Sequence, residues 1–261
     1  MRLHVHEWGD RASPPLVCLH GITAHGFRYR KLAEERLAAR FHVVAPDLRG
    51  HGRSGWDPPW RIESFVDDVL ETVDRVGVRE AAWLGHSFGG RLVMEIAARV
   101  PERVRRAILL DPAIEEEPAE ALVAAEHERA DKAYASVDEA IGARLTAGDG
   151  RTPREFVEEE MREHLVRSDD GLLRSRYCQS AVVALWGEMA TPPPPYERLR
   201  APTLLLYAPA SELVRADQVG AYRAALGELL DAVTVSGGHM VLWDAFAETA
   251  DAVESFLERS R

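Results

Sequence analysis

A serine set between two glycines is the part of this sequence best suited to chemistry. Ser87 lies in the stretch Gly85-His86-Ser87-Phe88-Gly89, which follows a short apolar run over 80–84. After it, over 91–100, apolar residues recur at helical spacing until Pro101. A strand, a tight turn and a helix are therefore expected. A serine on such a turn, at a helix N-terminus that favours a developing anion, is predicted to be a nucleophile. A chance match to so short a motif is the alternative, and the strand–turn–helix context disfavours it.

Polar residues follow other expected strands of the chain as well. His20, Asp47 and Asp111 each come directly after an apolar run, as Ser87 does. Strands alternate with helices, which predicts a mostly parallel, doubly wound α/β sheet with helices on both faces. Ligands bind where the carboxyl ends of such strands meet, so these four side chains are expected at one edge. The strands are expected at 3–8, 16–19, 41–46, 80–84, 105–111, 202–207 and 233–235, and the helices at 31–40, 61–76, 91–100, 216–226 and 246–257.

The alternation stops between residues 113 and 195. This segment has a helical pattern throughout, with its third helix expected from about 173 to 189, and it ends in four prolines. Over 115–170 there are 17 acidic and 7 basic residues, so this stretch carries most of the net charge of −11. We therefore expect a helical cap over residues 113–195, inserted into a core formed by residues 1–112 and 196–261.

Four motifs of the chain together resemble those of the α/β-hydrolase-fold superfamily. They are Cys18-Leu19-His20-Gly21, the glycine-rich loop over 47–54, Gly85-His86-Ser87-Phe88-Gly89-Gly90, and Gly238-His239. The resemblance implies a serine hydrolase with a helical cap, and a nucleophile, an acid and a histidine in that chain order. It makes Ser87 the nucleophile and His239 the general base. It also implies that the backbone N–H groups of Ile22 and Phe88 form an oxyanion hole. Such an enzyme needs neither a metal ion nor an organic cofactor.

Two acids compete for the third position of the expected catalytic triad. Many members of the superfamily carry an aspartate after the penultimate strand, but Ser211 stands at that position here and Glu212 follows it. An esterase- and lactonase-like subset takes its acid from the end of the strand after the nucleophile helix. Asp111 lies there, 24 positions after Ser87, and the resemblance to that subset favours it. Glu212 stays open as the alternative acid, and capping of the first turn of the cap stays open as the alternative role of Asp111.

The other histidines are expected to support the structure rather than to react. His86 precedes the nucleophile and should pack against or orient the site. His20 and His51 lie in expected loops, and we expect their rings to stabilise these loops through hydrogen bonds. His4 and His6 fall on one face of an expected strand, where we expect surface residues, because two ligands alone do not make a metal site.

Composition excludes several other classes of protein. The net charge of −11 argues against a nucleic-acid partner. No apolar run is long enough to span a membrane, and the first residues lack the apolar region of a signal peptide. The two cysteines, Cys18 and Cys178, form no metal-binding pattern, and reduced thiols in a cytoplasmic protein are expected. Whether the chain is a monomer or a homodimer stays open.

The predicted reaction is hydrolysis of a carboxylic ester or lactone through an acyl-enzyme on Ser87. A carbon–carbon bond hydrolase or a cofactor-free perhydrolase would use the same triad, and a small-molecule receptor that retains the fold is an alternative of another class. The acidic cap favours a small, neutral, partly hydrophobic substrate over a polyanion. Ordinary core packing is the alternative for each expected pocket residue: Phe27, Phe88, Tyr177, Val182, Leu185, Trp186, Met240 and Trp243.

Overall fold

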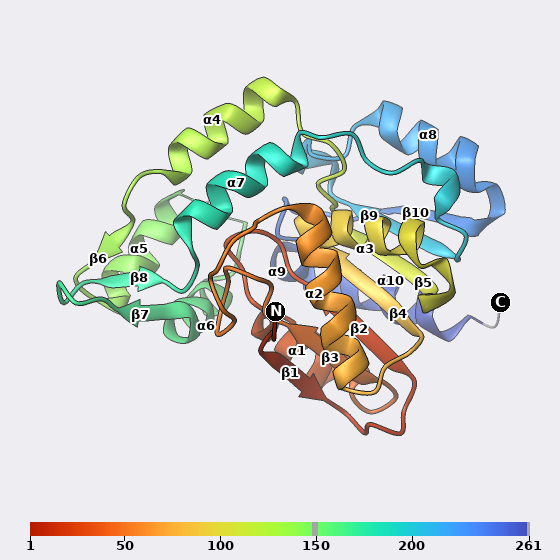
Figure 1. The fold of residues 1–261 in the computed structure, drawn as a ribbon, viewed down its shortest axis with the longest axis horizontal. Coiled ribbons are helices and arrows are strands. Elements are labelled where there is room, and N and C mark those ends of the chain that lie inside the picture. The colour runs from red at the N-terminus through yellow and green to blue at the C-terminus, as the bar shows by residue number, and fades with distance from the viewer. Residues whose placement is uncertain (148–150, 260–261) are drawn as a thin grey trace.

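Short apolar runs form the central sheet of the protein (Figure 1). In this computed structural model, which describes residues 1–147 and 151–259, seven strands lie in the order β1-β3-β2-β4-β5-β9-β10. β1 pairs with β3 in antiparallel fashion and the other neighbours pair in parallel, as predicted. Residues 148–150 of the expected cap and 260–261 of the expected core lie outside the described residues. The strands are β1 (Val5–Trp8), β2 (Pro15–Leu19), β3 (His42–Pro46), β4 (Ala81–His86), β5 (Val104–Leu110), β9 (Thr203–Tyr207) and β10 (Leu230–Thr234).

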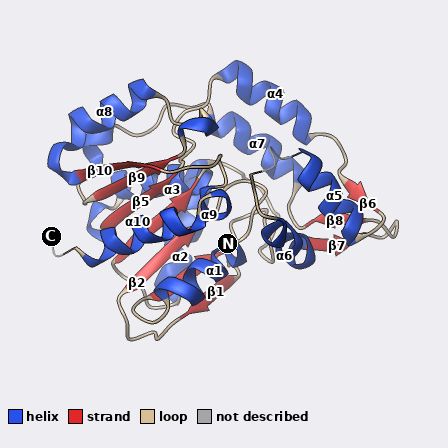
Figure 2. Cartoon of the chain, turned by 180° about the vertical axis from the view of Figure 1, so that it is seen from behind, coloured by secondary structure: helices blue, strands red, loops and turns tan. Residues whose placement is uncertain are grey.

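Helices cover both faces of the sheet, as Figures 1 and 2 show from opposite sides. Alternate side chains of each strand reach opposite faces: in β2, Val17 packs with the first helical layer, and Leu16 and Cys18 with the second. Cys18 and Cys178 are free thiols. None of the described helices is long and apolar enough to cross a membrane. The first layer consists of α2 (Ile62–Arg75), α3 (Phe88–Arg99) and α8 (Ala216–Leu226), and the second of α1 (Arg30–Leu32) with the π-helical turn Ala33–Leu37, α9 (Val241–Asp244) and α10 (Phe246–Glu258).

The long insertion between β5 and β9 is not entirely helical, which corrects the prediction. A three-stranded antiparallel sheet, in the order β6-β8-β7, lies among its helices. β7 and β8 form a hairpin around Asp170-Gly171, where Gly171 has a φ of +84°, and an Asp-Gly pair is a strong turn signal. The helix expected from 173 therefore starts only at Gln179. The elements are α4 (Pro118–Glu128), β6 (Ala133–Tyr134), α5 (Val137–Ala147), α6 (Arg154–His164), β7 (Leu165–Arg167), β8 (Leu173–Ser175) and α7 (Gln179–Met189).

One buried arginine holds both ends of the insertion. Arg91, in the first turn of α3, is 1% exposed and bonds Glu95 on the next turn. Its guanidinium donates to the carbonyl of Ile114 at 2.8 Å, where the insertion begins. It also donates to the carbonyls of Thr191 at 3.0 Å and Pro192 at 2.8 Å, where the insertion ends. The helix that follows Ser87 therefore fixes both stems of the insertion.

The turn between β4 and α3 depends on two glycines. A Cβ atom on Gly85 would lie 2.1 Å from the carbonyl oxygen of Gly89. A Cβ on Gly89 would lie 1.9 Å from the carbonyl oxygen of Leu19 in β2. Both contacts are with backbone atoms, which cannot move aside as a flexible side chain can. The sequence pattern Gly-x-Ser-x-Gly thus records how closely α3 approaches the sheet.

We expect Gly89→Ala to lower the free energy of unfolding by about 3 kcal/mol, because α3 or β2 must shift to admit the methyl group. Urea unfolding at neutral pH measures the loss. Gly187→Ala is the matched control: this exposed glycine of α7 has nothing within 4 Å of the added Cβ. It should gain about 0.5–1 kcal/mol from helix propensity. Equal stability of Gly89→Ala and the parent protein would contradict the packing argument.

Candidate active site

Ser87 occupies a strained turn between β4 and α3. Its φ of 55° and ψ of −121° are unfavourable for a residue with a side chain. Backbone hydrogen bonds hold this conformation: the N–H of Ser87 donates to the carbonyl of Leu110 at 3.1 Å. Its own carbonyl accepts from the N–H groups of Gly90 at 2.9 Å and Ala113 at 3.1 Å. The serine is therefore fixed at the carboxyl edge of the sheet, at the helix N-terminus.

The buried Asp111 pairs with His239, whose side chain is partly exposed and lines the same cavity as Ser87. Nδ1 of His239 lies 2.7 Å from Oδ2 of Asp111, which is fully buried. The other carboxylate oxygen accepts from the N–H of Ala208 at 3.1 Å and from the hydroxyl of Ser211 at 3.0 Å. Glu212, in contrast, is exposed in a left-handed conformation. The loop that carries an aspartate in many relatives therefore supplies a hydroxyl that holds Asp111.

Buried histidines support the loops around the site. Nε2 of His86 donates to the carbonyl of His239 at 2.8 Å. Nδ1 of His20 donates to the carbonyl of Gly21 at 2.7 Å, while its Nε2 accepts from the N–H of Leu48 at 2.9 Å. Burial lowers the pKa of both His86 and His20 well below the ordinary value, so both rings are neutral. Nδ1 of His51 likewise donates to the carbonyl of Arg49 at 2.9 Å.

The two expected oxyanion donors lie on either side of Ser87. A Cβ on Gly21 would lie 2.9 Å from the Cβ of Ser87, so the loop that contains Ile22 passes directly over the serine. Phe88 is the first residue of α3, and N–H groups in the first turn of a helix lack intrahelical partners. The Phe88 side chain packs edge-to-face on Phe65 in the core, away from the pocket, with 5.4 Å between the two ring centroids.

Ser87 and His239 line one cavity of about 260 Å³. Two of the expected pocket residues, Trp186 and Met240, line it too. Core and insertion both supply walls. The core contributes Gly21, Ile22, Thr23, Arg28, His86, Ser87, Ser211, Leu213, His239 and Met240, and the insertion contributes Ala113, Glu116, Glu128, Arg144, Trp186 and Met189.

Comparisons with known proteins agree with this architecture. A family model described as the alpha/beta hydrolase fold matches residues 14–246. The chain belongs to the α/β hydrolase family. It is 31% identical to Lipase LipV of Mycobacterium tuberculosis over 258 residues, which cover 98% of this chain and 97% of the relative. Family and relative together make the chain a hydrolase.

Solved structures show the same fold. The structure of E-2-(acetamidomethylene)succinate hydrolase matches with a TM-score of 0.86 and 23% identity, covering 98% of this chain and 95% of the other. The enol-lactonase from Burkholderia xenovorans LB400 matches with a TM-score of 0.80 and 20% identity, covering 98% and 96%. At these identities the likeness concerns the fold alone.

The remaining expected pocket residues of the hydrolase lie elsewhere. Phe27 and Trp243 line a separate hollow beside Phe156. Val182 and Leu185 are fully buried on α7, where they pack in the interior. Tyr177 precedes α7 and lines an adjoining cavity. Their apolar character predicted burial correctly but not which of several buried environments each side chain enters.

Four charged residues of the cavity were missed from the sequence: Arg28, Glu116, Glu128 and Arg144. Burial and the charge of Glu120 raise the pKa of Glu116 above its ordinary value. Arg28 lies in the 3₁₀ helix Gly26–Tyr29, a few residues after Ile22, and this closeness in sequence was the available signal for it. Nothing in the sequence distinguishes Arg144 from other arginines of the acidic insertion. The cavity is therefore more polar than the sequence led us to expect.

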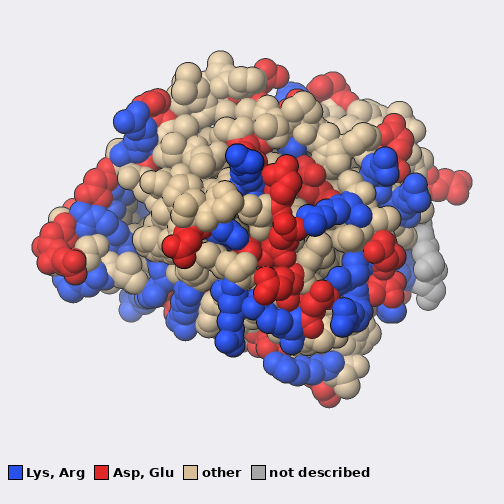
Figure 3. Space-filling view, in the orientation of Figure 1, with Lys and Arg blue, Asp and Glu red and all other residues tan. Residues whose placement is uncertain are grey.

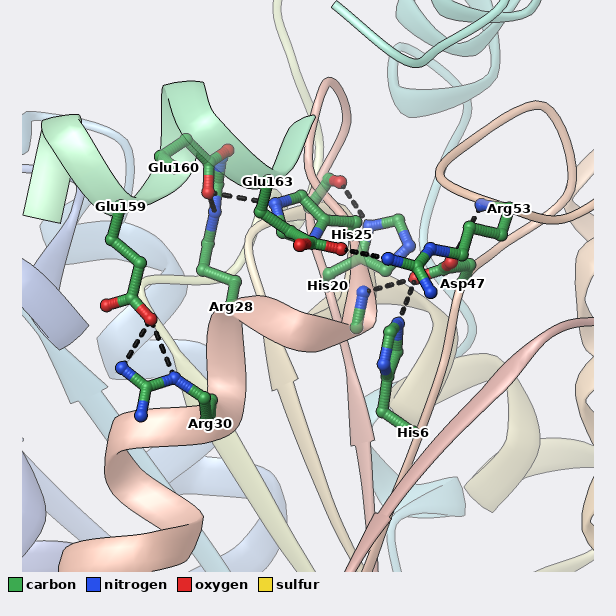
Figure 4. Close-up of polar contacts among 12 residues, drawn as sticks. His6, His20, His25, Arg28, Arg30, Asp47, Arg53, Glu159, Glu160 and Glu163 are labelled. Carbon is green, nitrogen blue, oxygen red and sulfur yellow. Dashed lines mark hydrogen bonds and ion pairs between the residues drawn. The ribbon is translucent and has the colours of Figure 1, made fainter. Parts of the chain in front are cut away.

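Helix α6 is joined to the core by three ion pairs (Figure 4). Glu160 pairs with Arg28 and with the ring of His25, whose Nε2 lies 2.9 Å away. Burial alone would raise the pKa of Glu160, but Arg28 and His25 outweigh it and hold that pKa well below the ordinary value. On either side along the helix, Glu159 pairs with Arg30 and Glu163 with Arg53.

Acidic residues of the insertion therefore meet basic residues of the core. On the face shown in Figure 3, acidic and basic side chains are interleaved over the core, whereas the surface over α4 and α7 is largely uncharged. On α4, the apolar residues Leu122 and Val123 are exposed, with 63% and 71% of their surface accessible to solvent. The charge excess seen in the sequence thus corresponds in part to contacts between insertion and core, rather than to a uniformly acidic surface.

Asp47 is buried near the sheet edge and joins neighbouring loops. Its carboxylate accepts from the N–H groups of Gly26 at 2.7 Å and Arg53 at 2.8 Å, and Nε2 of His6 lies 3.1 Å away. His6 is only 11% exposed at its side chain, which corrects the expected surface position. Ligand atoms of His4, His6 and Asp47 lie within 4.8 Å of one another, a spacing that a metal ion could use. Both Asp47 oxygens already accept hydrogen bonds, so its acceptors are used within the protein.

We expect Glu160→Gln to destabilise the hydrolase by about 3–5 kcal/mol at pH 7, because it leaves the buried charge of Arg28 uncompensated. A carboxyl with a lowered folded-state pKa stabilises the fold above its unfolded pKa, near 4.5, and loses this effect as pH falls. The difference between parent and variant should therefore shrink below pH 4.5. Urea unfolding at pH 7 and at pH 4 measures it.

Glu158→Gln on the same helix is the control for that experiment. Glu158 pairs with Arg154 one turn away, and its side chain is 34% exposed. Its loss should cost about 0.5 kcal/mol or less. Similar losses in the two variants, or a Glu160→Gln effect that does not change with pH, would show that the buried pair does not stabilise the contact between α6 and the core.

Proposed function

We propose that this chain is a serine hydrolase that cleaves a carboxylic ester or lactone of a small substrate through an acyl-enzyme on Ser87. One observation carries the proposal: Ser87 on its strained turn lines the same cavity as His239, and Asp111 holds the far side of the His239 ring. Membership of the hydrolase family and the lipase relative support the same reaction class.

In the proposed mechanism, Asp111 accepts a hydrogen bond from Nδ1–H of His239, which leaves Nε2 of that ring to take the Ser87 proton. The serine oxygen then attacks the substrate carbonyl. Backbone N–H groups of Ile22 and Phe88 stabilise the tetrahedral oxyanion, each by about 3–4 kcal/mol. Protonated His239 donates to the departing alkoxide, and a water activated by the same ring hydrolyses the acyl-enzyme.

We further propose that residues 113–195 act as a cap over a core formed by residues 1–112 and 196–261. Six of these residues line the cavity together with Ser87, which supports the division. A cap excludes bulk water from the reacting carbonyl and strengthens the electrostatic interactions there. The specificity of the hydrolase would then depend on both parts of the chain.

We expect Asp111→Asn to reduce kcat by about 1000- to 10,000-fold, because the amide no longer orients and stabilises the imidazolium. Glu212→Gln is the matched control, since it makes the same chemical change in the neighbouring exposed acid. It should keep kcat within about twofold. Steady-state hydrolysis of a short p-nitrophenyl ester measures both. The assignment is wrong if Glu212→Gln loses turnover while Asp111→Asn retains it.

Labelling separates an enzyme from a binding protein that retains the fold. The parent protein should hydrolyse the p-nitrophenyl ester and react with a fluorophosphonate probe, whereas Ser87→Ala should do neither. Mass spectrometry of the labelled protein locates the adduct. If the parent shows neither turnover nor labelling, the chain is a small-molecule receptor. If it labels but leaves esters and lactones intact, the carbon–carbon hydrolase and perhydrolase alternatives gain support.

A further inference from the structure

The cavity at Ser87 continues into a second space under the insertion. A cavity of about 100 Å³ shares four lining residues with the first: Thr23, Arg28, Glu128 and Arg144. Beyond them it is lined by polar side chains of the insertion, among them Lys132, Tyr134, His164 and Tyr177. A substrate that reacts at Ser87 can therefore extend past Arg144 into this second, polar compartment.

Arg144 is the basic residue of this space that lacks an ion pair. The guanidinium of Arg28 is bound by Glu160, and the ammonium group of Lys132 lies 2.9 Å from Glu128. Within the described parts of the chain, Arg144 makes neither an ion pair nor a hydrogen bond. The side chain of Arg144 is in contact with solvent. Its pKa is lowered by the protein atoms packed around it and by the nearby positive charge of Arg28. Arg144 therefore lines both cavities with a guanidinium that no carboxylate of the described residues binds directly.

We infer that Arg144 binds a carboxylate of the substrate, so that the preferred substrates are esters or lactones with a carboxylate remote from the scissile bond. This inference rests on the proposed hydrolysis at Ser87. A guanidinium presents a planar fork of donors that matches a carboxylate in two parallel hydrogen bonds. A substrate that carries a carboxylate takes the place of the neutral substrate that the acidic composition of the insertion suggested.

The other charged residues of the cavity determine what charge the substrate can carry and which of its ends lies near Ser87. Glu116 and Glu128 line the same space as Arg144, so a dianion such as a phosphate ester would meet repulsion that a single carboxylate largely avoids. Glu116 lines only the compartment with Ser87, whereas Arg144 lines both. The anionic end of the substrate is therefore directed away from Glu116 towards the second compartment, which leaves the neutral ester carbonyl at Ser87.

Matched substrates test the inference directly. Mono-p-nitrophenyl esters of adipic, pimelic and suberic acid carry a terminal carboxylate, and their ω-amides replace it with a neutral group of similar size. For the chain length that the parent hydrolyses best, we expect kcat/KM to be at least tenfold higher for the ester with a carboxylate than for its ω-amide. Most of this difference should come from a lower KM. The preference should fall as ionic strength rises. Arg144→Gln should bring the ratio close to one.

Arg154→Gln is the control, since it removes the same charge from an exposed arginine of the neighbouring helix α6. It should keep the tenfold preference. A parent protein that hydrolyses acid and amide equally, or an Arg144→Gln variant that keeps the preference, overturns the inference while leaving the serine hydrolase intact. Loss of all turnover and of labelling at Ser87 would instead overturn the proposed function.

A binding measurement tests Arg144 without turnover. Adipate should bind the Ser87→Ala variant in a calorimetric titration, and adding Arg144→Gln should weaken this binding at least fivefold. Adding Arg154→Gln should leave it unchanged. Equal adipate affinity with and without the Arg144 guanidinium would contradict the carboxylate site, whatever the esterase assays show.

Discussion

The buried carboxylate of Asp111 is the group on which the arrangement of the site depends. A fully buried charge is stable only when hydrogen bonds satisfy it, and this one accepts from His239, from the N–H of Ala208 and from Ser211. These donors come from the loops after β9 and β10, while Asp111 itself directly follows β5. One carboxylate therefore joins the ends of three adjacent strands and fixes the ring of His239 beside Ser87. The site is a consequence of burying that charge.

Much of the core could be predicted from the sequence because its signals are local. The strand, turn and helix around Ser87 follow from apolar spacing and from two glycines whose Cβ atoms would collide with backbone. The mostly parallel pairing of the sheet follows from the alternation of strands and helices. The proximity of Asp111 and His239 could be anticipated as well, because both follow strands whose carboxyl ends share one edge. The choice of Asp111 over Glu212 came from the resemblance to one subset of the superfamily, and not from local pattern alone.

The insertion could not be predicted in the same way, because its structure depends on contacts distant in sequence. The strands β6, β7 and β8 are two or three residues long, too short for an alternating pattern to register. Val182 and Trp186 are both apolar and one helical turn apart, yet only Trp186 lines the cavity. The burial of His6 could not be seen in the sequence, since its partner, Asp47, lies 41 residues away. Such choices follow from how elements pack, which periodicity does not encode.

Charge explains how the insertion can be held firmly while its cavity stays polar. Its acidic residues on α6 are matched by Arg28, Arg30 and Arg53 of the core, so much of the acidity in the sequence is used at that contact. Arg144 stands outside this matching and faces the cavity. A charged side chain that lines a cavity without an ion-pair partner is a candidate for binding a ligand of opposite charge.

The two ends of the insertion have different physical restraints. At the stems, Arg91 of α3 donates to three carbonyls of the insertion, and the N–H of Ala113 donates to the carbonyl of Ser87. These short-range bonds between core and insertion hold the stems, and with them Glu116 and Met189, near the serine. At the far end, α6 is held by ion pairs that depend on pH and, where exposed, on salt. The two ends of the insertion therefore respond differently to pH and salt: the ion pairs at α6 weaken, whereas the carbonyl contacts of Arg91 do not change. Arg144 lies on α5, at the end that depends on charge.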